Sequence, residues 1–164
     1  MGRVDGSLPH LPFPPADAEQ NDDPDPSGVR RQKRLRVLVA DDEALVGAAL
    51  KRALAAHEVT VVPGGHAAVL ALRERGPFDL VLCDVMMPDL SGPRVYEAVR
   101  EALPEMAARF VFITGGVLQE QHRKFLHALP NRVLYKPFDL NTVRELVMKT
   151  KRAAISGRAS RTAS

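Results

Sequence analysis

Apolar and polar residues follow two alternating spacings along the middle of this chain. Short, nearly continuous apolar runs are typical of strands covered on both faces. LRVLVA is such a run, and EVTVV, DLVLC, RFVFIT and RVLY are four further short candidate strands. Each is followed by a segment whose apolar residues recur at the three- and four-residue spacing of an amphipathic helix. These segments are ALVGAALKRALAAH, HAAVLALRER, PRVYEAVREAL, residues 117–129 and LNTVRELVMKTK. The pattern predicts five strand–helix units in strict alternation.

This alternation predicts an α/β fold with a parallel sheet. Short connections and right-handed crossovers place successive strands side by side in parallel, with helices on both faces. Five units are too few to close an eight-stranded barrel. We therefore expect an open, doubly wound five-stranded sheet. Ligands of such sheets bind beyond the carboxyl ends of the strands, near the point where the strand order reverses.

The two ends of the chain differ from the middle in composition. Residues 1–34 contain six prolines and the acidic stretch DAEQNDDPD, and they lead into the basic cluster Arg30–Arg36. Residues 152–164 are mostly small or polar. Neither end has enough apolar surface to form a core, so we expect two disordered tails and one domain at residues 35–151. The initial Met favours a free chain, although the composition of 1–34 also suits a linker between domains.

The net charge of +3 comes from the residues outside 35–150. Residues 35–150 carry 14 Lys and Arg residues and 14 Asp and Glu residues, so the predicted domain is neutral. A charged tail is usually a solvated tail, and we expect no direct nucleic-acid binding; the role of Arg30–Arg36 stays open. No apolar run is long enough to span a membrane. Cys83 is the single cysteine, which excludes an intrachain disulfide and favours a reducing, cytoplasmic setting.

Reactive side chains follow four of the five predicted strands. Residues 41–43 (Asp-Asp-Glu) follow the first strand, and Asp84, Thr114 and Lys136 follow the third, fourth and fifth. Each feature alone is more often a helix cap or a turn residue than part of a functional site. Together they lie on one edge of the predicted sheet, which favours a functional site. Converging carboxylates repel one another unless a cation is present, and oxygen ligands without a dedicated cage suit Mg²⁺.

A site of this kind suits a phosphoryl group. Mg²⁺ and Lys136 would hold its oxygens while a carboxylate acts as nucleophile and forms an acyl phosphate. The buried run before Asp84 would aim that carboxylate, and Pro88 and Gly92 would shape the loop beyond it. Met86 can offer its backbone carbonyl to the metal while its side chain packs.

Four motifs, VLVADDE, LVLCDVMMPDLSG, FVFITGG and YKPF, occur in this order and resemble those of the receiver domain of two-component response regulators. The spacings from Asp42 to Asp84, from Asp84 to Thr114 and from Thr114 to Lys136 are 42, 30 and 22 residues, close to those of the family. The resemblance covers about residues 35–150. It implies a flavodoxin-like sheet with strand order 2-1-3-4-5.

The resemblance also implies how the acidic residues bind Mg²⁺. Asp42, Asp84 and the backbone carbonyl of Met86 would coordinate the ion directly. Asp41 would act mostly through metal-bound water. The cofactor expected for this chain is therefore Mg²⁺, held entirely by oxygen atoms.

For the phosphoryl group, the resemblance implies that Asp84 is the phosphoacceptor. Thr114 would bring its hydroxyl to the phosphoryl group, and Lys136 would pair with it. The Lys136–Pro137 peptide is often cis in relatives. The chain would be a signalling domain rather than an enzyme, although it would promote its own phosphorylation and dephosphorylation.

The implied partner is a histidine kinase or a phosphotransfer protein that supplies the phosphoryl group from its own histidine. The new charge would shift an equilibrium between two conformations. The surface expected to move, which could also form a homodimer, comprises the last two helices and the fifth strand. Relatives commonly carry Tyr or Phe three residues before the lysine, where this chain has Val133. Either Tyr135 substitutes for that aromatic residue or the output surface works differently.

Two other functions fit parts of the pattern. A Mg²⁺-dependent hydrolase with an Asp nucleophile would need a second acid two residues later, where this chain has Met86. A scaffold without switching would not need a complete acidic site. After the last predicted helix too few residues remain for a DNA-binding domain. The chain is thus expected to act through protein partners, either alone or as the receiver of a hybrid kinase.

Overall fold

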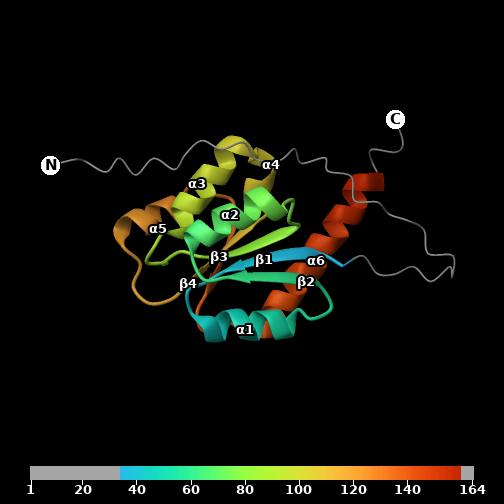
Figure 1. Cartoon of the computed structure of the whole chain (residues 1–164), viewed down its shortest axis with the longest axis horizontal. Helices are drawn as coiled ribbons and strands as arrows, with labels where there is room; N and C mark the ends of the chain where they lie inside the picture. The colour runs from blue at the N-terminus through green and yellow to red at the C-terminus, as the bar shows by residue number, and fades with distance from the viewer. Residues whose placement is uncertain (1–33, 160–164) are drawn as a thin grey trace.

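The structure, a computed structural model, describes residues 34–159. The expectation of disorder in residues 1–33 and 160–164 lies outside the described residues. Five strands alternate with helices, as the sequence pattern predicts (Figure 1). The strands are β1 (Arg36–Ala40), β2 (Glu58–Val62), β3 (Leu80–Asp84), β4 (Phe110–Thr114) and β5 (Arg132–Tyr135). The helices are α1 (Ala44–Ala53), α2 (Gly65–Arg75), α3 (Gly92–Ala102), α4 (Pro104–Ala107), α5 (Glu120–His127) and α6 (Leu140–Ala159).

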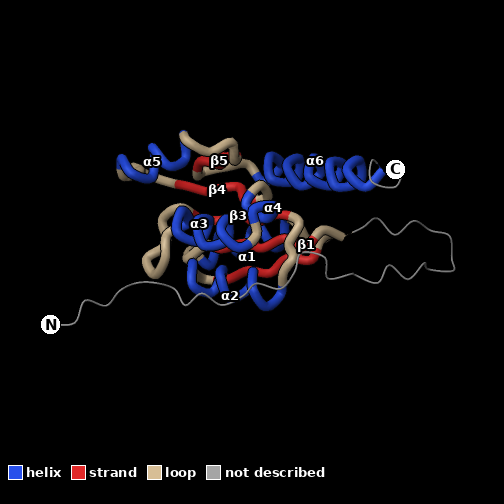
Figure 2. Tube along the Cα trace, turned by 90° about the horizontal axis from the view of Figure 1, so that it is seen from above, coloured by secondary structure: helices blue, strands red, loops and turns tan. Residues whose placement is uncertain are grey.

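All strand pairs are parallel and their order is β2-β1-β3-β4-β5, which confirms the predicted sheet. Figure 2 shows the strands side by side, with α5, β5 and α6 gathered at one edge of the molecule. In the register, Ala40 pairs with Cys83, Asp84 with Ile113, and Thr114 with Tyr135. The carboxyl ends of β1, β3, β4 and β5 therefore meet at one edge of the sheet.

The sheet separates two hydrophobic cores, because successive side chains of a strand point to opposite faces. On one face, Cys83 and Phe112 pack against α2, α3, α4 and α5. On the other face, Leu82 and Ile113 pack against α1 and α6. These four strand residues are fully buried, and each such apolar side chain of the size of Leu or Phe stabilises the fold by about 1.5–3 kcal/mol. The two cores hold β3 and β4 rigidly from both sides.

Cys83 is a core residue, as expected from its place in the third strand. Its burial raises the pKa of the thiol, so it stays protonated at physiological pH. His122 is half-buried on α5.

Helix α4 is one turn that the apolar pattern does not predict. Pro104 lies in its first turn, where proline is tolerated, and Met106 is buried with 1% of its surface exposed. The turn is thus stabilised by tertiary packing of Met106 rather than by helical periodicity.

The helix expected at 117–129 is shorter than predicted. Helix α5 begins at Glu120, and Val117 is 96% exposed in the loop before it. Gly116 has φ +69, a left-handed conformation that glycine adopts without strain. The chain leaves β4 through this turn and Val117–Gln119 remain loop, so the apolar residues at 117 and 118 do not mark a helix start.

The last helix is longer than expected. The prediction ended it at Lys151, with a disordered tail from residue 152, whereas α6 continues to Ala159 and its final turns extend beyond the sheet (Figure 1). Lys151, Arg152 and Ala153 are good helix formers without an interrupting proline. Small and polar composition therefore did not end the helix.

Candidate functional site

Polar side chains are buried at the carboxyl edge of the sheet. Among the residues that the structure describes, the buried polar or charged ones are Asp41, Asp84 and Thr114, which are 2%, 4% and 1% exposed. Asp84 and Thr114 end β3 and β4, and Asp41 directly follows β1. Burying a polar group is costly unless partners compensate it. The concentration of these groups at one edge therefore indicates a functional site.

Lys136, which follows β5, places its ammonium among three carboxylates. Its Nζ lies 2.9 Å from Asp84 Oδ2, 3.1 Å from Asp41 Oδ2 and 2.7 Å from Glu43 Oε1. Burial alone would lower the pKa of Lys136, but its close contacts with the carboxylates of Glu43, Asp84 and Asp41 outweigh this effect and raise the pKa above its ordinary value. The lysine is therefore a permanent cation at the bottom of the site.

Backbone N–H groups orient both buried carboxylates. The N–H of Glu43 donates to Asp41 Oδ1 at 2.8 Å, and the N–H of Met86 donates to Asp84 Oδ1 at 2.9 Å. In both residues the other oxygen, Oδ2, faces Lys136. Each carboxylate thus has one oxygen held by the loop that follows its strand and one turned into the site.

The charge of Asp41 is costly in this position. Burial raises its pKa above the ordinary value and the nearby Asp84 charge adds to this, although the Glu43 N–H and Lys136 act in the opposite direction. Asp41 Oδ2 lies within ion-pair distance of Lys136 but accepts no hydrogen bond of good geometry from the described residues. An additional positive charge nearby would compensate the negative charge on this oxygen.

The arrangement fits a divalent cation. Asp41, Asp42 and Asp84 each offer one carboxylate oxygen, and these atoms lie within 4.8 Å of one another. Asp42 is exposed at the mouth of the site, whereas the other two are buried. Hard oxygen ligands that leave room for several waters are the ligand set that Mg²⁺ prefers. The residues predicted from the sequence to bind Mg²⁺ are thus brought together, apart from the Met86 carbonyl, whose role stays a prediction.

Thr114 lies at the end of β4, between the strands that carry Asp84 and Lys136. Its Oγ1 is buried and has no hydrogen-bond partner among the described residues. Its carbonyl accepts a hydrogen bond of 2.7 Å from the Lys136 N–H, which fixes the two residues relative to each other. The Lys136–Pro137 peptide is cis, as the resemblance implies.

Two glycines allow close packing at the site. A Cβ on Gly92 would lie 2.4 Å from the carbonyl oxygen of Asp84, so only glycine fits there. A Cβ on Gly115 would lie 3.2 Å from the Lys136 side chain. The expected role of Gly92 in shaping the loop after Asp84 is confirmed by this contact.

The loop after Asp84 is anchored by Asp89, a residue that the sequence analysis did not single out. Its carboxylate accepts hydrogen bonds of 3.0 Å from the N–H groups of Gly65 and His66, at the start of α2, and lies 3.1 Å from His66 Nδ1. Burial alone would raise the pKa of Asp89, but the N–H groups of His66, Gly65 and Leu90 outweigh it and lower the pKa to about 2. Asp89 therefore caps α2 from a distant loop, which no local sequence signal reveals.

The position of the usual aromatic residue is filled by an aliphatic one. Val133 is half-buried and packs against the core that contains Tyr96, Phe112 and Phe125. Tyr135 lies at the end of β5 and is 63% exposed. An exposed aromatic side chain is thus available next to Lys136, although not at the position found in relatives.

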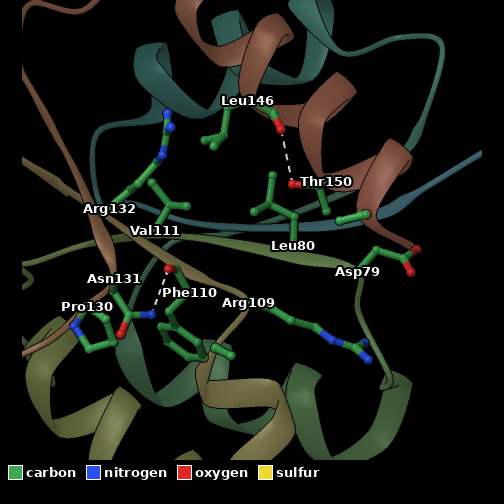
Figure 3. A pocket seen from close by; sticks show the side chains of 12 residues that line it. Asp79, Leu80, Arg109, Phe110, Val111, Pro130, Asn131, Arg132, Leu146 and Thr150 are labelled. Atoms are coloured by element: carbon green, nitrogen blue, oxygen red, sulfur yellow. Dashed lines mark hydrogen bonds between the residues drawn. The ribbon is translucent and has the colours of Figure 1, made fainter. Parts of the chain in front are cut away.

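A separate cavity of about 440 Å³ lies at the opposite edge of the sheet (Figure 3). It is lined by the beginnings of β3, β4 and β5 and by α6, and its polar groups are largely bonded to the backbone. Asn131 donates to the carbonyls of Ala107 and Phe110, and Thr150 donates to that of Leu146. The guanidinium groups of Arg109 and Arg132 point away from each other in Figure 3. The cavity therefore takes no part in the carboxylate site.

Comparison with known proteins agrees with this geometry. Residues 37–148 match the response regulator receiver domain family. Over 123 residues the chain is 31% identical to the response regulator receiver protein CpdR of Brucella abortus, covering 74% of this chain and 98% of CpdR. It is 28% identical over 121 residues to the signal transduction histidine-protein kinase BarA of Escherichia coli K12, covering 71% of this chain but only 13% of BarA.

Solved structures show the same fold. The receiver domain of AraT, a response regulator from Geobacillus stearothermophilus, superposes with a TM-score of 0.64 at 28% identity, covering 77% of this chain and 99% of that one. The receiver domain of the sensor histidine kinase PA1611 from Pseudomonas aeruginosa, solved with a magnesium ion in its active-site cleft, gives 0.61 at 25% identity, covering 73% and 98%. None of the helices in residues 34–159 has the length and apolar character needed to cross a membrane. Since the family match covers most of the chain and the fold agrees, this chain belongs to the response regulator receiver domain family, the signalling domains of two-component systems.

Proposed function

We propose that this receiver domain accepts a phosphoryl group on Asp84. The observation that carries the proposal is the position of Asp84 Oδ2, 2.9 Å from Lys136 Nζ and among the three aspartates that can hold a metal ion. Asp84 is 4% exposed and ends a strand that is buried on both faces, so its carboxylate is held in one orientation. Such a pre-oriented nucleophile needs little rearrangement before it reacts.

In the proposed reaction, a carboxylate oxygen of Asp84 attacks the phosphorus of a phosphohistidine on a partner protein. A new O–P bond forms and the P–N bond breaks. The electron pair of the P–N bond stays with the imidazole, which leaves on the partner. The product is an acyl phosphate on Asp84. Lys136 pairs with the phosphoryl oxygens, and the unpartnered Thr114 hydroxyl donates a hydrogen bond to them.

Asp41, Asp42 and Asp84 would hold Mg²⁺, with the Met86 carbonyl as a further ligand. When bound, the ion offsets the negative charge of the carboxylates and of the phosphoryl oxygens. The magnesium in the active-site cleft of the PA1611 receiver domain supports this assignment. The poorly compensated Asp41 carboxylate supports it independently.

A histidine kinase or a phosphotransfer protein in the cytoplasm is the proposed phosphodonor, and the similarity to BarA, a signal transduction histidine-protein kinase, supports a partner of this class. The output would be a conformational shift of α5, β5 and α6, the surface that could also form a homodimer. The exposed Tyr135 and Met148 are available on these elements for a protein partner. We propose no direct nucleic-acid contact.

Phosphorylation by acetyl phosphate and Mg²⁺, followed by intact mass measurement, tests the proposal. The wild type should gain one phosphoryl group, and Asp84→Asn should gain none. Asp139→Asn is the matched control, because Asp139 lies outside the site and accepts the Asn141 N–H at 3.0 Å, a role that Asn also fills. Phosphorylation of Asp84→Asn would refute the assignment, and absence of phosphorylation in the wild type would favour a scaffold without switching.

A further inference from the structure

The ammonium of Lys136 is already engaged by carboxylates. An ammonium group carries three donors. In this structure three carboxylates, those of Asp41, Glu43 and Asp84, surround its Nζ at distances of 3.1, 2.7 and 2.9 Å. It donates hydrogen bonds to Glu43 and Asp84, whereas Asp41 Oδ2 is within ion-pair distance only. A phosphoryl group on Asp84 would therefore compete with these carboxylates for Lys136.

The three carboxylates differ in their freedom to leave. The side chains of Asp41 and Asp84 are 0% and 5% exposed, and each has its second oxygen held by a backbone N–H. The Glu43 side chain is 60% exposed and directly precedes α1, at the mouth of the site. Its contact with Lys136 is the shortest of the three, but its side chain is by far the most exposed to solvent. Glu43 can therefore turn into water at small cost, whereas the two aspartates cannot.

We propose that Glu43 is a placeholder for the phosphoryl group. Its carboxylate occupies the Lys136 hydrogen that a phosphoryl oxygen later takes, and it keeps the ammonium directed into the site until then. This inference rests on the proposed phosphoacceptor function. Because a phosphoryl group adds between about −1.5 and −2 charges, the Glu43 carboxylate both competes with it for Lys136 and repels it. Glu43 is thus a positioning residue that sets how strongly the site holds the phosphoryl group.

Titration with beryllofluoride, a mimic of the phosphoryl group that needs no phosphodonor, tests the placeholder role. Each variant is first saturated with Mg²⁺, and the bound fraction is followed by ¹⁹F NMR. Glu43→Gln removes the charge but keeps the shape of the side chain. We expect it to bind beryllofluoride roughly twofold to fivefold more tightly than the wild type, the effect of losing one partly exposed ion pair. Equal or weaker binding by Glu43→Gln would overturn the proposal.

Glu101→Gln is the matched control. It removes one negative charge from the exposed face of α3, away from the carboxylate site, and should bind like the wild type. Equal tightening in Glu101→Gln would assign the effect to net charge and overturn the placeholder role. If the wild type binds no beryllofluoride, or if Asp84→Asn binds it as well, the proposed function fails too. If the wild type binds beryllofluoride, Asp84→Asn does not, and Glu43→Gln binds it like the wild type, then the proposed function stands and only the placeholder role is wrong.

Discussion

Lys136 Nζ lies 2.9 Å from Asp84 Oδ2, although 52 residues separate the two in the sequence. The contact exists because β3 and β5 both flank β4 and run parallel, so that their carboxyl ends lie at the same edge of the sheet. It places the half-buried ammonium of Lys136 directly against the proposed phosphoacceptor. The stability of the domain and the chemistry of the site are therefore coupled, and this coupling can be measured.

Replacing Lys136 by Met should destabilise the domain. Asp41 and Asp84 would then converge without the ammonium, which should lower the free energy of unfolding by about 2–4 kcal/mol. Part of this loss should be restored by millimolar Mg²⁺. Urea unfolding with Mg²⁺ or with a chelator measures both effects. Lys124→Met removes an exposed lysine from α5 and should change stability little. A Lys136→Met variant as stable as the wild type would contradict the expected repulsion.

Replacing Asp41 by Asn should stabilise the metal-free domain. Burial and the neighbouring Asp84 raise the folded-state pKa of Asp41 above its unfolded value, so its ionised form opposes folding at neutral pH. The free-energy cost of ionising Asp41 in the folded state is absent below pH 3.8, its unfolded-state pKa. It grows as the pH rises from there and is complete above the folded-state pKa. We expect a gain of about 1 kcal/mol at pH 7 and weaker Mg²⁺ binding. Urea unfolding in a chelator and calorimetric Mg²⁺ titration check the two results. Loss of stability in the chelator would mean that the ion pair with Lys136 dominates.

Asp89 should stabilise the domain only while it is ionised. Its folded-state pKa is lowered to about 2 from 3.8, so its contribution is fully present above pH 3.8 and is lost as the pH falls through about 2. Asp89→Ala should lower the free energy of unfolding by about 1 kcal/mol at pH 7, the usual effect of losing a helix cap. The difference between variant and wild type should shrink towards pH 2. A difference that stays constant over this range would show that the carboxylate charge is not responsible.

Replacing Gly92 by Ala should disturb the site through the backbone of Asp84. The new Cβ would lie 2.4 Å from the backbone oxygen of Asp84, and neither backbone segment can move without displacing that carboxylate. We expect a loss of about 2–4 kcal/mol in unfolding free energy and slower phosphorylation by acetyl phosphate. Gly116→Ala is a suitable comparison, because its Cβ meets nothing within 4 Å and only its φ of +69 is unfavourable. That variant should lose only about 1 kcal/mol. Equal losses in the two variants would refute the steric explanation.

The pattern of residues along the chain determined the fold and most of the site. The alternation of five short strands with helices predicted the parallel sheet, because short connections and right-handed crossovers place successive strands side by side in parallel. The positions of Asp41, Asp84, Thr114 and Lys136 then followed, since the carboxyl ends of parallel strands share one edge. A residue directly after a strand is placed by the backbone alone, so its location in the site does not depend on its side-chain conformation.

The tertiary structure alone decided the contacts between distant side chains. Glu43 was visible in the sequence as an acid after the first strand, but its contact with Lys136 spans 93 residues. Three further features also depend on which segments meet in space. They are the capping of α2 by Asp89, the burial of Met106 in the single turn of α4, and the packing of Val133. Such contacts are set by sheet register, crossover geometry and side-chain reach, none of which is encoded in the local spacing of apolar residues.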